Sequence, residues 1–103
     1  MTDRELLELA AKAAGYTLRE HYAGFPLIAE ELNAAWNPLT DDGDALRLAV
    51  KLQFNFNLED FNTIDVWCSD TCKNATEEFT DDPYAATRKA IVRAAAEIGK
   101  GMT

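Results

Sequence analysis

Apolar residues recur every three or four positions in three stretches of the chain, and this spacing predicts three amphipathic helices. The first covers about residues 2–14, the second about 42–52 and the third about 83–102. Side chains that accept backbone N–H groups stand at the start of each, and a proline stands in the first turn of the last. These starting residues are Thr2 with Glu5 as a capping box, Thr40 or Asp41, and Asp82 followed by Pro83.

Apolar and polar residues alternate between these helices, which predicts strands. The first two form a hairpin around a turn at residues 23–26, whereas residues 30–35 suit either a short helix or extended chain. The predicted fold class is α+β, with an antiparallel sheet of three to five strands covered by helices in an αβα-type sandwich, as one domain spanning residues 1–103. The predicted strands cover residues 16–22, 27–29, 54–58, 63–68 and 73–79.

The acidic charge of the chain narrows the choice of partner. Net charge is −8 over 103 residues, and residues 30–82 hold thirteen carboxylates against three basic side chains. This balance argues against direct binding of nucleic acid and of anionic membranes, since both attract basic proteins. A protein with a basic surface is the favoured partner, although solubility alone also accounts for a net charge of this size.

The residues that carry chemistry are few. His21 is the sole histidine, and we interpret it as a surface side chain because no nucleophile is recognisable beside it. Cys68 and Cys72 are predicted to be free thiols, with Cys68 a small core residue at the end of a strand. We therefore predict no catalytic residue, no cofactor and no metal site.

The acidic turn at residues 41–44 superficially suggests a metal loop. An EF-hand would need a glutamate at its twelfth position, where this chain has Leu52. Magnesium-dependent hydrolysis remains an alternative on charge grounds, whereas helix capping by Asp41 and Asp44 explains the turn more simply. The carboxylates considered for magnesium are Asp41, Asp42, Asp65 and Asp70.

Two sequence blocks resemble small accessory proteins of tailed phages and prophages, of the phage αβα-sandwich (NinX-related) type. The second block is residues 82–99, and the first combines a proline turn with an acidic helix start. The resemblance implies a phage origin and this fold, and it transfers no catalytic residue. We see no apolar run long enough to span a membrane and no secretory leader at residues 1–5. Together with the resemblance, this leads us to expect a cytoplasmic location in the host bacterium. The residues of the first block that form the motif are Trp36, Asn37, Pro38, Asp41, Asp42, Gly43 and Asp44.

These observations predict a phage-encoded acidic accessory protein that binds a host protein. A host defence system that binds nucleic acid, such as a CRISPR effector, is a natural target, because carboxylates can occupy a basic groove meant for phosphate. The alternatives are a homo-oligomeric assembly module, for which a homodimer suffices, and a small metal-dependent enzyme as the least favoured. Strand alternation places Trp67 opposite the Ile64 face, where it is either an anchor for a partner or, in a sandwich buried on both sides, a core residue. The predicted partner surface comprises Trp67, Asp65, Glu77, Glu78 and Asp81.

Overall fold

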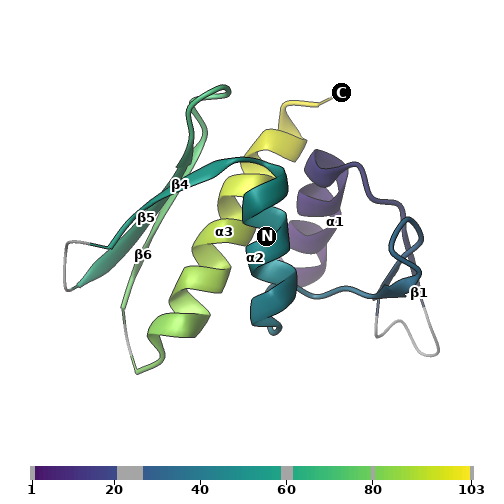
Figure 1. Ribbon diagram of the computed structural model, residues 1–103, viewed down its shortest axis with the longest axis horizontal. Coiled ribbons are helices and arrows are strands. Elements are labelled where there is room, and N and C mark those ends of the chain that lie inside the picture. Colours follow the sequence, from purple (N-terminus) through teal and green to yellow (C-terminus); the bar gives the residue numbers. More distant parts are fainter. Residues whose placement is uncertain (1, 21–26, 59–61, 80, 103) are drawn as a thin grey trace.

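The computed structural model describes residues 2–20, 27–58, 62–79 and 81–102, and within these ranges the chain forms three helices and six strands (Figure 1). His21 and the expected turn at 23–26 lie outside the described residues. In chain order the elements are α1 (Asp3–Ala14), β1 (Leu18–Glu20), β2 (Leu27–Ala29), β3 (Ala34–Ala35), α2 (Asp42–Lys51), β4 (Phe54–Asn57), β5 (Thr63–Cys68), β6 (Asn74–Glu78) and α3 (Pro83–Lys100).

All three helices begin at residues that the sequence indicates. Thr2 and Glu5 form the expected capping box on α1, which ends at Gly15 in the left-handed conformation. Asp41 caps α2 by accepting the Asp44 backbone N–H at 2.8 Å. Asp82 caps α3 by accepting two backbone N–H groups of its first turn. Short polar side chains thus set the limits of the helices, because they satisfy N–H groups that have no partner within the helix.

The strands form two antiparallel sheets, each of three strands, in the orders β1-β2-β3 and β4-β5-β6. The predicted α+β class with a helix-covered antiparallel sheet is confirmed, and its strands are divided between two sheets. Of the ambiguous stretch 30–35, only Ala34–Ala35 is extended, after a turn in which Asn33 has a φ of 51°. The helices lie between the two sheets (Figure 1).

Helix α3 is the centre of the molecule. It packs against α1 on one side and against β5 and β6 on the other, with α2 also in contact. Small residues of both helices form the contact between α1 and α3. A Cβ atom at Gly99 would collide with the backbone of Leu9. The α1–α3 contact therefore depends on side chains as small as alanine and glycine.

The β4-β5-β6 sheet buries one face and exposes the other. Ile64 and Val66 of β5 and Ala75 of β6 are buried against the helices. Along β4, Phe54 packs partly against this core, whereas Phe56 is 40% exposed although it lies on the same face. In Figure 1, strand β4 leaves the end of α2 and runs away from that helix. The apolar face of the sheet is consequently left open at this end.

Candidate binding groove

A groove of about 450 Å³ lies between the first turns of α2, the first turns of α3 and strand β4. Phe79, Ala45 and Ile91 line it where it meets the core, and larger apolar side chains line it toward solvent. Leu46 of α2 is 60% exposed and Tyr84 of α3 is 70% exposed. Exposed apolar side chains that cluster in a concave surface are typical of a binding site. The remaining lining residues are Asp42, Phe56, Leu58, Pro83, Thr87 and Arg88.

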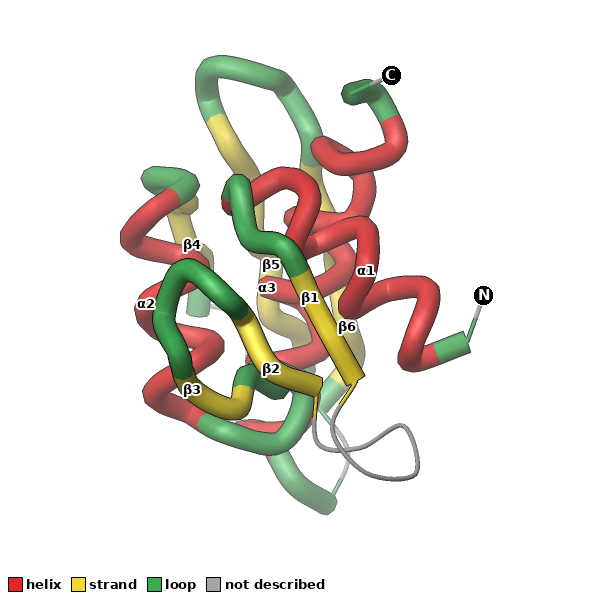
Figure 2. The backbone as a smooth tube through the Cα atoms, turned by 90° about the vertical axis from the view of Figure 1, so that its right-hand side faces the viewer, coloured by secondary structure: helices red, strands yellow, loops and turns green. Residues whose placement is uncertain are grey.

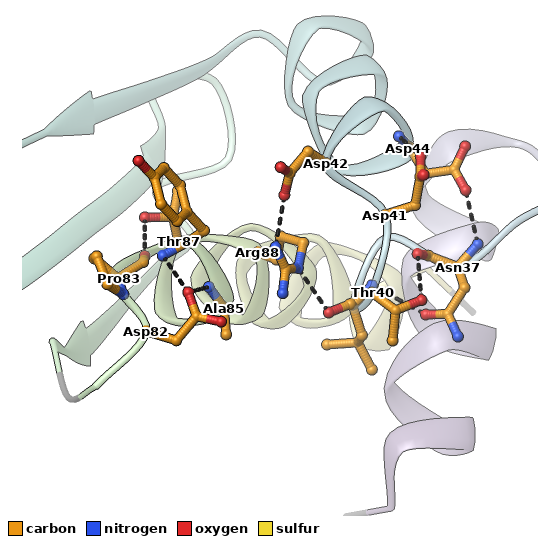
Figure 3. Close-up of polar contacts among 12 residues, drawn as sticks. Asn37, Thr40, Asp41, Asp42, Asp44, Asp82, Pro83, Ala85, Thr87 and Arg88 are labelled. Carbon is orange, nitrogen blue, oxygen red and sulfur yellow. Dashed lines mark hydrogen bonds and ion pairs between the residues drawn. The ribbon is translucent and has the colours of Figure 1, made fainter.

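Helix capping and one arginine fix the relative positions of the two helices that form the groove (Figure 3). The Arg88 guanidinium of α3 donates from Nε to the Leu39 carbonyl at 2.9 Å and from Nη1 to the Asp42 carboxylate at 2.6 Å. Thr87 donates its hydroxyl to the Pro83 carbonyl at 2.8 Å. Because the guanidinium of Arg88 already has internal partners, the groove offers a ligand mainly apolar surface.

The motif turn before α2 has a structural role. Trp36 is buried and contacts the edge of Tyr16, with ring centroids 5.6 Å apart, and Pro38 is fully buried. Asn37 closes the turn by accepting the Leu39 backbone N–H at 3.1 Å. These contacts join the end of β3 to the start of α2, which places Asp42 and Leu46 at the groove.

Asp44 differs from its sequence-based interpretation as a helix cap. Its side chain does not cap α2: it is only 8% exposed and accepts the Asn37 backbone N–H at 2.9 Å. The Arg47 guanidinium donates to the same carboxylate at 2.7 Å. Asp44 therefore fastens the proline turn to the helix, whereas Asp41 provides the cap. Gly43 lies in this first turn, close to Arg47.

The four carboxylates considered for magnesium have separate positions. Asp41 and Asp42 belong to the start of α2, Asp65 accepts the Thr76 hydroxyl at 2.7 Å on the sheet, and Asp70 is exposed in the turn after β5. Among the residues that the structure describes, no group of three or more His, Cys, Asp or Glu side chains could hold a metal ion.

The predicted partner surface is divided by the structure. Trp67, which is 37% exposed, shares the outer face of the sheet with Asp65 and Glu78. Glu77 points to the opposite face and forms an ion pair with Arg93 of α3, since neighbouring residues of a strand point to opposite faces. Asp81 is exposed in the loop before α3. The outer sheet face therefore keeps three of the five predicted residues.

The two thiols are free, as predicted, and differ in environment. Cys68 is buried and Cys72 is exposed. A hydrogen bond from the Thr71 hydroxyl lowers the pKa of Cys68, helped by the backbone N–H groups of Thr71 and Asp70 and opposed by burial. Cys72 has a φ of 59°, which fits its place in the tight turn after β5. The lowered pKa of Cys68 therefore belongs to a thiol with little solvent access.

Comparison with protein-family models, curated proteins and solved structures found no match to this chain. No helix in the described part of the chain is both long and apolar enough to cross a membrane.

The groove was not predicted from the sequence. Two features of the sequence belong to it: Leu46 is a large apolar residue near the start of the second predicted helix, and Phe56 follows Phe54 at the spacing of one strand face. Tyr84 of α3 is one of its exposed walls. The sequence did not show that these residues of α2, β4 and α3 come together.

Proposed function

We propose that this chain is a phage-encoded acidic accessory protein that binds a host protein and catalyses no reaction. The observation that carries the proposal is the exposed apolar groove between α2, α3 and β4. Leu46, Phe56 and Tyr84 expose apolar surface there although a stable core lies directly beneath. A partner that covers them gains about 1.5–3 kcal/mol for each large side chain that becomes fully buried.

The groove replaces Trp67 as the proposed main anchor. Anchor residues of protein interfaces are aromatic or large apolar side chains in concave, well-packed surroundings. Phe56 and Tyr84 are aromatic side chains that line a concave surface, whereas Trp67 lies on an open sheet face among polar neighbours. The outer sheet face with Asp65 and Glu78 then contributes mainly charge to the encounter.

Charge determines the kind of partner that we propose. At a net charge of −8, the chain attracts basic proteins and repels nucleic acid and copies of itself. Host proteins that bind nucleic acid present such basic surfaces, and a CRISPR effector is one example. The resemblance of the motif and of residues 82–99 to phage accessory proteins supports a host cytoplasmic setting.

The test is affinity capture from lysate of the host bacterium at low and high salt, with two variants beside the parent chain. Leu46→Ser removes an apolar wall of the groove, and Val50→Ser makes the same kind of change on an exposed residue of α2 outside the groove. We expect a basic protein to be retained by the parent chain and by Val50→Ser. Leu46→Ser should weaken its affinity by about tenfold, because each factor of ten corresponds to about 1.4 kcal/mol.

Unchanged capture by Leu46→Ser would place the interface outside the groove, and equal loss with both variants, if each keeps the circular dichroism of the parent chain, would place it on the exposed side of α2. A parent chain that retains no host protein even at low ionic strength would contradict the proposed function. A dimer of the chain that persists at all salt concentrations would favour the assembly alternative.

A further inference from the structure

We propose that the free edge of β4 receives an extended segment of the partner as a fourth strand, whose side chains alternate between the groove and solvent. This inference rests on the proposed function and adds the conformation and composition of the bound segment. It is carried by the backbone of β4, by the residues of that strand and by the position of the groove beside it.

The backbone groups that face the free edge follow from the hydrogen bonds of β5. The Cys68 N–H donates to the Lys73 carbonyl at 2.9 Å, so the even-numbered residues of β5 pair with β6 and the odd-numbered ones pair with β4. Trp67 lies opposite Asn55 in the register. The backbone of Asn55 therefore points to β5, and that of Phe54 and Phe56 points outward, available to a further strand.

Strand β4 lacks two of the features that usually prevent strand addition, namely charged residues and proline. Natural edge strands are shielded by charged residues, prolines, bulges or covering elements. Strand β4 reads Phe54-Asn55-Phe56-Asn57 and has neither a charge nor a proline. The other edge strand of the same sheet, β6, carries Glu77 and Glu78. The sheet thus has one charged edge and one uncharged edge, and the uncharged edge adjoins the groove.

The groove lies where alternate side chains of an added strand would point. Phe56 lines the groove with its side chain while its backbone faces the free edge. Helix α2, which contributes Leu46 as the facing wall, lies on the β4 side of the molecule in both views (Figures 1 and 2). A strand placed about 4.8 Å beyond β4 would run between β4 and α2. Every second side chain would then enter the groove, and the others would lie beside Asn55 and Asn57.

Charge favours a basic segment over a second copy of this chain. Two copies would bring net charges of −8 together along the paired edges. A segment that alternates apolar residues with Lys or Arg fills the groove and also meets the acidic surface, including the exposed Asp65 side of the sheet.

The experiment uses three synthetic peptides of equal length with the full-length chain. One alternates Val and Lys, one alternates Val and Glu, and one carries Leu and Lys at helical spacing. We expect the Val-Lys peptide to bind about tenfold or more tightly than the other two by isothermal calorimetry. Amide hydrogen exchange followed by NMR should then show new protection at Phe54 and Phe56, with Asn55 and Asn57 little changed because they already pair with β5.

Leu46→Ser should weaken binding of the Val-Lys peptide, and Val50→Ser should not. Neither variant changes the net charge, so a difference between them would tie binding to the groove. Tighter binding of the helical peptide, or peptide binding that leaves the Phe56 amide unprotected, would overturn strand addition. Absence of peptide binding at millimolar concentration would do so too. If lysate capture still depended on Leu46 in any of these cases, the proposed function would stand and only the binding mode would fail.

Discussion

The Asp44 carboxylate joins two segments of the chain, because it accepts the Asn37 backbone N–H of the proline turn and the Arg47 guanidinium of α2. Its neighbour Asp41 performs the simpler task of capping the helix. The two aspartates look alike in sequence, yet one is buried and the other is exposed. Burial raises the cost of losing the carboxylate, since the Asn37 N–H would be left without its acceptor.

Replacing each aspartate separately measures this difference. Asp41→Ala should lower the free energy of unfolding by about 1 kcal/mol, the usual cost of a lost cap. Asp44→Ala should cost more, about 2–3 kcal/mol, because a buried donor and a charged partner lose their acceptor together. Chemical denaturation measures both, with Asp81→Ala as an exposed control.

Equal losses for the two variants would contradict the linking role of Asp44. Stoichiometric magnesium or calcium binding that Asp41→Ala abolishes would contradict the cap interpretation.

The thiols give a second prediction at the residue level. Thiolates are the reactive form, and the pKa of Cys68 is lowered, yet Cys68 is buried whereas Cys72 is exposed. We expect iodoacetamide to modify Cys72 first in the native chain, as measured by mass spectrometry of its peptides. Modification of Cys68 should become fast only in denaturant. Faster native labelling at Cys68 would mean that its surroundings open readily.

The two cysteines should also be dispensable for folding. Replacing both with alanine should leave the chain folded by circular dichroism, with a modest loss of stability from the smaller side chain at Cys68. The control is the parent chain with and without reductant, whose thermal transition should not change. A transition that collapses on reduction or on zinc chelation would show that a bridge or a metal is required.

At the level of elements, the contact between α1 and α3 decides how the helices lie. Gly99 allows the backbone of α3 to contact that of Leu9 in α1. The alanines of both helices let the rest of the two helices pack closely. Close backbone approach of this kind leaves no space for an added methyl group.

A pair of glycine variants tests this contact. Gly99→Ala should destabilise the fold by about 1–3 kcal/mol, because overpacking forces the two helices apart. Gly101→Ala is the matched control, since a Cβ atom there meets only ordinary contacts of α3 itself. Thermal or urea unfolding measures both. Similar stability of the two variants would show that α1 shifts at little cost.

At the level of the whole molecule, the uneven charge should control the rate of association with a basic partner. Glu78→Lys reverses a charge on the outer sheet face that also carries Asp65 and Trp67, and Glu30→Lys makes the same change in the turn between β2 and β3. We expect Glu78→Lys to slow association with the captured host protein more than Glu30→Lys and to reduce its salt dependence, while dissociation changes little. Surface plasmon resonance at several salt concentrations measures both rates.

Trp67→Ala belongs to the same experiment. Faster dissociation of this variant would extend the interface from the groove to the outer sheet face, as the sequence first indicated. Equal effects of the two charge reversals would instead mean that only total charge matters. Glu77 is unsuitable for such a test, because its reversal would also break the ion pair with Arg93.

The sequence alone determined the local structure. Helix limits followed from Thr2, Asp41 and Asp82, since capping depends on residues at most three positions apart. The strands followed from the alternation seen in Phe54–Asn57 and Thr63–Cys68, because the period of two is a property of the strand itself. The net charge also follows from the sequence alone, and so does the charge that a partner is expected to carry.

Only the tertiary structure decided which of these residues meet. Periodicity could not separate the roles of Asp41 and Asp44, or show that Glu77 forms an ion pair with Arg93 of α3. Nor could it show that Phe56 stays exposed while Phe54 packs inside, because burial depends on whether another element covers that part of the strand. The groove lies between α2, β4 and α3, and the relative positions of packed elements are set by contacts between residues distant in sequence, such as that of Arg88 with Asp42.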